Sequence, residues 1–123
     1  MKRSLHILAD LYGCAGDSRY LTHKGSVRTK TLAMIRRAGF LIVASRFHKF
    51  VETGMGDSGI TGVVIVSESH ITLHTWPEKQ FVNLDVFLCN YTRDNTVKAR
   101  AIFREFVKLY RPKRVKRREI WRD

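Results

Sequence analysis

The sequence predicts an α+β fold, a two-layer α/β sandwich in which two helices cover one face of a mainly antiparallel sheet. Several short segments show the alternation or the β-branched content of strands, and two longer segments repeat apolar residues at helical spacing. The chain has 123 residues, 44% of them hydrophobic and 28% charged, which is enough to bury one core. We therefore expect a single domain over residues 1–123.

The first third of the chain is expected to form a strand, a helix and a second strand. Apolar residues alternate with more polar ones over 5–11, the period-2 pattern of a half-buried strand. Residues 13–25 are polar and punctuated by glycine, so we expect a loop. Apolar residues then recur at helical spacing over 26–39, a segment that begins at a capping serine, Ser26, and ends at a glycine. Residues 40–47 are β-branched and aromatic, which favours a strand.

Three further strands are expected in the middle of the chain. A loop containing four glycines covers 52–62. Residues 63–66 form a continuous apolar run, which predicts a strand buried on both faces. Residues 70–74 and 81–89 alternate between apolar and polar side chains, so each is expected to form a strand with one buried face.

The C-terminal third predicts an amphipathic helix followed by a basic strand. The helix covers 95–110 and stops before Pro112. Its buried stripe is expected to be Val97, Ala101, Ile102, Phe106 and Leu109. Residues 113–121 are rich in Lys and Arg, which favours a strand at an exposed edge of the sheet, where such charges discourage aggregation.

The net charge of +12 is the strongest feature of the composition. Residues 108–123 hold eight Lys or Arg against two acidic residues, so this segment carries half of the net charge. A solvated edge is the simplest interpretation, and nucleic-acid binding is a less favoured one. Because no apolar run approaches the length of a membrane span, we expect a cytoplasmic protein with no membrane contact. Cys14 and Cys89 are then expected to be reduced thiols.

One ordered stretch carries the chemistry. Residues 59–78 read GITGVVIVSESHITLHTWPE, and residues 84–89 read LDVFLC. This order closely resembles the signature of the prokaryotic S-adenosylmethionine decarboxylase proenzyme family, in which Ser-Glu-Ser-His leads into His-Thr-Trp-Pro-Glu and then Asp, an aromatic residue and Cys. The resemblance extends more weakly to HILADLYGC at residues 6–14 and FHKF at residues 47–50.

The resemblance implies a zymogen that makes its own cofactor. Decarboxylation of an α-amino acid needs a carbonyl that condenses with the substrate amine as a Schiff base and withdraws electrons, and a peptide-bound pyruvoyl group supplies one. Attack of the Ser69 hydroxyl on the Glu68 carbonyl would convert the amide into an ester. Elimination and hydrolysis would then leave a β chain of residues 1–68 and a pyruvoyl-blocked α chain of residues 69–123.

The same resemblance implies roles for the surrounding side chains. His74 is expected to transfer a proton during processing, and the Thr61 hydroxyl to assist the acyl shift. Cys89 is expected to protonate the substrate carbanion, whereas Glu78 and Phe50 correspond to substrate-binding positions for ribose hydroxyls and an aromatic base. No metal is expected, because no pair of histidines has convincing zinc spacing with a third partner.

Strand parity predicts an irregular backbone at the cleavage site. In an uninterrupted strand Ser69 and His74 lie on opposite faces, because the side-chain period is two. The two side chains meet within the strand only if the chain bends or bulges at the scissile bond. Strain at this point would also favour the acyl shift.

Two departures from the family pattern bear on the substrate. The loop between Phe50 and Thr61 is longer than usual, and residues 79–83 read KQFVN where relatives commonly have Gly-Tyr-Ala-Ala. The main hypothesis is S-adenosylmethionine decarboxylation, which supplies the aminopropyl donor for spermidine synthesis. The alternatives are a pyruvoyl-dependent ornithine or arginine decarboxylase and, from another class, a non-catalytic basic nucleic-acid-binding module. A single helix layer leaves one sheet face to be covered, so we also expect a homodimer with its active site near the interface.

Overall fold

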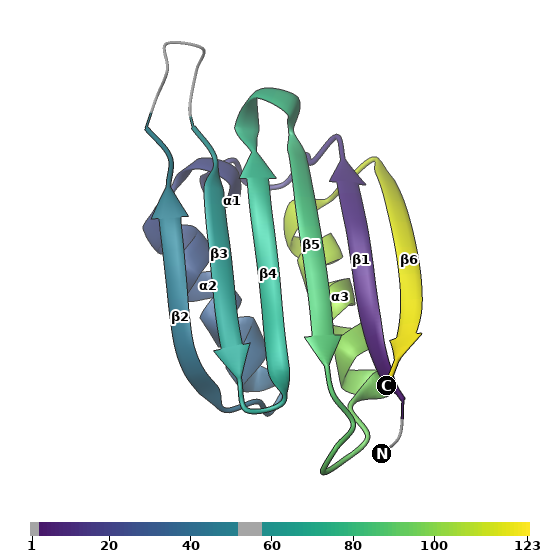
Figure 1. Ribbon diagram of the computed structural model, residues 1–123. Helices are drawn as coiled ribbons and strands as arrows, with labels where there is room; N and C mark the ends of the chain where they lie inside the picture. Colours follow the sequence, from purple (N-terminus) through teal and green to yellow (C-terminus); the bar gives the residue numbers. More distant parts are fainter. Residues whose placement is uncertain (1–2, 52–57) are drawn as a thin grey trace.

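The structure, a computed structural model, describes residues 3–51 and 58–123. These residues form a six-stranded sheet in the order β2-β3-β4-β5-β1-β6, and every neighbouring pair is antiparallel (Figure 1). The strands are β1 Ser4–Tyr12, β2 Ile42–Lys49, β3 Ile60–Val66, β4 Ser69–Trp76, β5 Phe81–Leu88 and β6 Arg114–Arg122. The helices are α1 Arg19–Thr22, α2 Lys24–Arg37, the 3-10 turn η1 Pro77–Lys79 and α3 Thr96–Tyr110.

The two long helices, α2 and α3, lie on the same face of the sheet, which confirms the predicted two-layer sandwich (Figure 1). We call the opposite face the open face. The core forms between the sheet and the helices from alternate strand residues. Ile7 and Val86, for example, pair across β1 and β5 and are fully buried. Each large apolar side chain buried in this way contributes about 1.5–3 kcal/mol.

The prediction that residues 63–66 form a strand buried on both faces is wrong. Val64 and Val66 are buried in the core, but Val63 and Ile65 are 36% and 45% exposed. These two side chains lie on the open face, where no helix covers them. The continuous apolar run therefore belongs to a one-sided antiparallel sheet, and its exposed half leaves an apolar surface there.

The buried side of α3 is also rotated from the one predicted. Ile102 and Phe106 are buried as expected, but Val97 is 75% exposed. The observed stripe follows i, i+3, i+4 spacing through Ala99, Ile102, Phe103, Phe106 and Tyr110. Val97 precedes Ala99 by two residues and so is turned about 200° away from the sheet.

The ends of the N-terminal elements differ from prediction in detail. Part of the expected loop at residues 13–25 forms the short helix α1. The N-cap of α2 is His23 in place of the predicted Ser26, because the His23 Nδ1 accepts a hydrogen bond from the Ser26 backbone N–H at 3.0 Å. Gly39 ends the helix as predicted, with a φ of 91°. Residues 52–57 of the expected glycine-rich loop lie outside the described residues.

The basic segment near the C-terminus forms β6 at the edge of the sheet, as predicted. Three of its arginine side chains lie over aromatic rings of β1, α3 and β5. Their guanidinium groups are 4.3–4.9 Å from the ring centroids, in the pairs Arg114–Tyr12, Arg117–Phe103 and Arg122–Phe87. Over the described ranges, no helix is both long and apolar enough to span a bilayer.

The corrected face of α3 can be tested by a pair of alanine substitutions. Ile102→Ala removes a buried side chain and should lower the free energy of unfolding by about 2–5 kcal/mol. Val97→Ala, on the exposed side of the same helix, should change it by less than about 0.5 kcal/mol. Urea titration followed by circular dichroism measures both, and equal losses would contradict the assigned helix face.

Candidate active site

The bond between Glu68 and Ser69 lies in the tight turn that joins β3 to β4. Ser67 and Glu68 form the turn, and Val66 pairs with Ser69 across it. Ser69 has a φ of 135°, a conformation that costs a non-glycine residue on the order of 1–3 kcal/mol. The irregular backbone expected at the scissile bond is therefore present, and it takes the form of a strained residue at the start of β4.

Glu68 is held through both its main chain and its side chain. Its carbonyl oxygen accepts a hydrogen bond of 2.7 Å from the Cys89 backbone N–H. Its carboxylate accepts hydrogen bonds from Ser67 Oγ and Arg93 Nε, both at 2.6 Å, and from Asn95 Nδ2 at 3.1 Å. We call Glu68, Ser69 and Cys89 the scission site.

The contacts of the Glu68 carboxylate also decide its charge. Burial raises the pKa of this carboxyl, but the hydrogen bonds from Ser67, Arg93 and Asn95 and the charge of Arg93 outweigh it, so the pKa lies below its usual range. The carboxylate is therefore ionised at neutral pH. The family motif indicated neither Arg93 nor Asn95, and the sequence analysis placed Asn95 only as the first residue of the helix expected over 95–110.

Thr61 and His74 form a second group on the open face. They pair across β3 and β4, and Thr61 Oγ1 is hydrogen-bonded to His74 Nδ1 at 2.9 Å. A polar row continues across the sheet on the same face, because His74 pairs with Asn83 and Asn83 Nδ2 donates to Asp10 at 2.8 Å. Thr61 and His74 are thus held together by a direct hydrogen bond, beside a row of polar side chains.

The structure does not bring the Thr61–His74 pair to Ser69 within one chain. His74 follows Ser69 by five residues along β4, which separates their Cα atoms by about 17 Å. The Ser69 hydroxyl instead lies 3.4 Å from Nδ1 of His70. Despite the strained backbone at Ser69, the Thr61–His74 pair and Ser69 therefore lie toward opposite ends of β4.

The two expected substrate-binding residues lie at the Thr61–His74 end of the sheet. Phe50 follows β2 and its backbone N–H donates to Gly59, just before β3. Its half-exposed ring lies edge-on to His48, with the ring centroids 4.9 Å apart. Glu78 lies in η1, which joins the far end of β4 to β5 at the upper end of the sheet in Figure 1.

The two cysteines lie in different environments, and both are free thiols. Cys14 is buried in the core, and burial raises the pKa of its thiol to about 11. Cys89 is partly exposed and follows β5, so its backbone reaches the Glu68 carbonyl. In the part of the chain that is described, no group of three His, Cys, Asp or Glu side chains could hold a metal ion.

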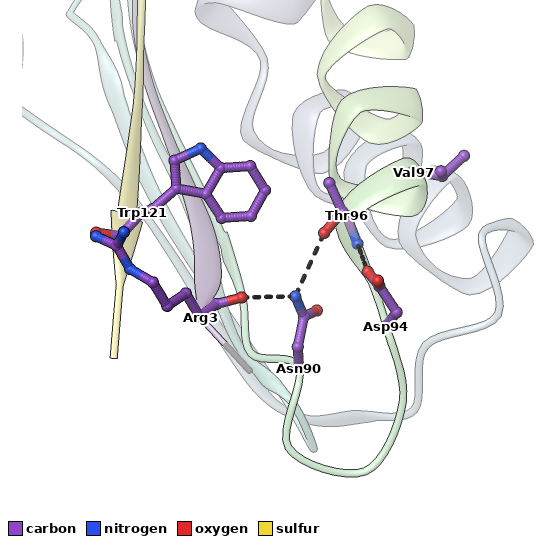
Figure 2. A pocket seen from close by; sticks show the side chains of 6 residues that line it. All are labelled: Arg3, Asn90, Asp94, Thr96, Val97 and Trp121. Carbon is purple, nitrogen blue, oxygen red and sulfur yellow. Dashed lines mark hydrogen bonds between the residues drawn. The ribbon is translucent and has the colours of Figure 1, made fainter. Parts of the chain in front are cut away.

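A hollow of about 690 Å³ opens beside the residue that follows Cys89 (Figure 2). Asn90 lines it, and its amide donates to the Arg3 carbonyl at 2.9 Å and to Thr96 Oγ1 at 3.3 Å. The residues that line it are Arg3, Asn90, Asp94, Thr96, Val97 and Trp121. None of the site residues predicted from the sequence lines this hollow.

Comparisons with known proteins agree with the motif. The family model described as S-adenosylmethionine decarboxylase matches residues 5–123. The S-adenosylmethionine decarboxylase proenzyme of Persephonella marina is 38% identical over 111 residues, which cover 90% of this chain and 75% of that protein. The proenzyme of Clostridium kluyveri is 43% identical over 84 residues, 68% of this chain and 61% of that protein.

A solved structure shows the same fold. The crystal structure of the adenosylmethionine decarboxylase from Aquifex aeolicus superposes with a TM-score of 0.82 at 30% sequence identity. The match covers 98% of this chain and 91% of the other. The likeness therefore extends across the whole sheet and both helices, beyond the motif itself.

Proposed function

The chain belongs to the S-adenosylmethionine decarboxylase family, and we propose that it is a proenzyme that cuts itself between Glu68 and Ser69 and then decarboxylates S-adenosylmethionine. The product would be the aminopropyl donor for spermidine synthesis. One observation carries the proposal. The scissile peptide lies in a strained turn, with its carbonyl oxygen already bound to the Cys89 N–H.

The self-cleavage step follows from these contacts. The Ser69 Oγ attacks the Glu68 carbonyl carbon, and the developing oxyanion is stabilised by the Cys89 N–H that already binds this oxygen. The C–N bond then breaks, which leaves an ester and a free amine at residue 69 and relieves the strained peptide. Loss of the Ser69 Cα proton expels Glu68 as a carboxylate. Water then hydrolyses the resulting dehydroalanine to a pyruvoyl group with release of ammonia.

The scission site suits the pyruvoyl cofactor that this family implies, and Phe50 and Glu78 suit its substrate. A pyruvoyl group would withdraw electrons from the substrate carbon as carbon dioxide leaves. The partly exposed Cys89 follows the strand beside residue 69, which suits the thiol to return a proton to that carbon. The aromatic ring of Phe50 and the carboxylate of Glu78 suit a purine and ribose hydroxyls, respectively.

We further propose that the complete site forms in a homodimer. Within one chain, Thr61 and His74 lie at the far end of β4 from Ser69. In a twofold dimer that packs open face against open face, the Thr61–His74 pair of one chain would meet the scission site of the other. Apolar side chains exposed on this face support the packing, namely Val63, Ile65 and Ile120. The same packing would bring Phe50 and Glu78 to the partner's Ser69.

The expected result for the purified, denatured protein is two masses, residues 1–68 and a pyruvoyl-blocked 69–123. Ser69→Ala removes the nucleophile and should remain whole on prolonged incubation. Ser45→Ala, on β2 away from the site, should cleave as the wild type does. Intact-mass spectrometry of the wild type and of both variants measures whether each chain is cleaved. A wild-type chain that stays whole and binds nucleic acid with steep salt dependence would instead support the basic binding module.

Cys89→Ala should separate cleavage from decarboxylation. The variant keeps the backbone N–H at residue 89 and should still form both fragments. Its release of carbon dioxide from S-adenosylmethionine should fall about 10²- to 10⁴-fold, because the proton donor is lost. Cys14→Ala, in the core, is the control and should retain activity per folded protein. If the wild type instead released carbon dioxide from ornithine or arginine and not from S-adenosylmethionine, its substrate would be a basic amino acid.

Co-expression tests whether the site is shared between chains. Neither Ser69→Ala nor His74→Ala should cleave when expressed alone. In the mixed dimer, the Ser69→Ala chain supplies His74 to the intact Ser69 of the other chain. The His74→Ala chain should therefore be cut only in the mixture, in proportion to the mixed dimers formed. Failure to cut in isolated mixed dimers would contradict the shared site and leave self-cleavage within one chain.

A further inference from the structure

We propose that Arg93 and Asn95 are positioning residues that hold the Glu68–Ser69 peptide bond in place for self-cleavage. The inference rests on the proposed self-cleavage and adds the device that orients the bond. Arg93 and Asn95 bind the Glu68 carboxylate, while the backbone of the same loop binds the Glu68 carbonyl. We call the connection from Cys89 to Asn95 the anchor loop.

The anchor loop contacts both the side-chain carboxylate and the main-chain carbonyl of Glu68, and Asn95 links the two contacts. Asn95 donates from Nδ2 to the Glu68 carboxylate at 3.1 Å and also to the Cys89 carbonyl at 2.9 Å. The Cys89 N–H in turn binds the scissile carbonyl at 2.7 Å. Asn95 itself is fully buried, and its backbone N–H donates to Asn90 at 2.7 Å. A shift of the carboxylate therefore displaces the group that orients the carbonyl.

Arg93 also contacts the connection between α2 and β2. Its guanidinium donates to the Gly39 carbonyl at 3.2 Å and lies 5.1 Å from the ring centroid of Phe40. These contacts come from the connection that follows α2, so Arg93 joins the scissile turn to the helix layer. Its side chain is 42% exposed, whereas that of Glu68 is only 11% exposed. The carboxylate is thus the sheltered member of the pair.

The geometry of the acyl shift explains why such a hold matters. The Ser69 hydroxyl and the Glu68 carbonyl belong to adjacent residues, so small rotations of the turn change the angle of attack. Without the contacts of the anchor loop with Glu68, the backbone could rotate at Glu68 and relieve the strained φ of Ser69. A displacement of about 1 Å in a reacting group costs as much as 10²-fold in rate. The anchor opposes that rotation.

The test compares two arginine–glutamate pairs whose arginine side chains are similarly exposed. Arg93 pairs with Glu68, and Arg100 pairs with Glu119 at 3.0 Å with its side chain 40% exposed. Each chain is made in a cell-free reaction and sampled over time by intact mass. Arg93→Gln should slow cleavage at least about tenfold, whereas Arg100→Gln should change it less than about twofold. The thermal midpoints of the two variants should be similar.

Two further variants separate positioning from folding. Arg93→Lys restores the charge beside the Glu68 carboxylate and should recover most of the lost rate. Glu68→Gln keeps the scissile carbonyl but weakens the same ion pair, and it should slow cleavage by a similar factor. The double variant Glu68→Gln with Arg93→Gln should be no slower than the slower single variant, because both changes remove one interaction.

Each outcome has a distinct meaning. If the wild type cleaves and Arg93→Gln cleaves as fast, the positioning role is overturned and self-cleavage stands. If Arg93→Gln and Arg100→Gln are equally slow, the effect is one of general stability, which also overturns it. Fully additive effects in the double variant would show that Arg93 acts elsewhere. A wild-type chain that never cleaves would overturn the proposed function and this inference together.

Discussion

The packing of both long helices on one face of the sheet governs the rest of the structure. It makes alternate residues of β1 and β5 bury against α3, and it leaves their neighbours on the open face. Burial supplies the stability, so the open face is free to carry polar chemistry such as the Thr61–His74 pair. The same one-sidedness leaves Val63 and Ile65 without cover. One face of the sheet thereby supplies the buried core, and the other is left for polar side chains.

The direction of the strands then sets where the predicted site residues lie. The β3–β4 turn and the end of β5 lie together, which places Glu68 beside the Cys89 N–H. The opposite ends of the same strands hold Thr61, His74 and the turn that carries Glu78. The sheet thus separates groups that are close in sequence, and the proposed twofold dimer would bring them together.

Local pattern predicted most of the fold, because period-2 alternation and helical spacing reflect burial that neighbours impose. It failed at Val63 and Ile65, since an apolar run does not reveal whether its second face has a cover. Parity predicted an irregular backbone at Ser69, which is present, but the irregularity does not bring Ser69 to His74. Arg93 and Asn95 were missed because their contacts with Glu68 depend on a loop that is remote in sequence.

The strand order has a consequence for the fate of the two fragments. A cut after Glu68 would divide the sheet so that β1 belongs to one piece while its hydrogen-bonded neighbours on either side, β5 and β6, belong to the other. The pieces are interleaved, and separating them requires both ladders along β1 and the ladder between β3 and β4 to break. Scission of the backbone would thus remove a covalent link while the shared sheet would hold both products together without a cross-link.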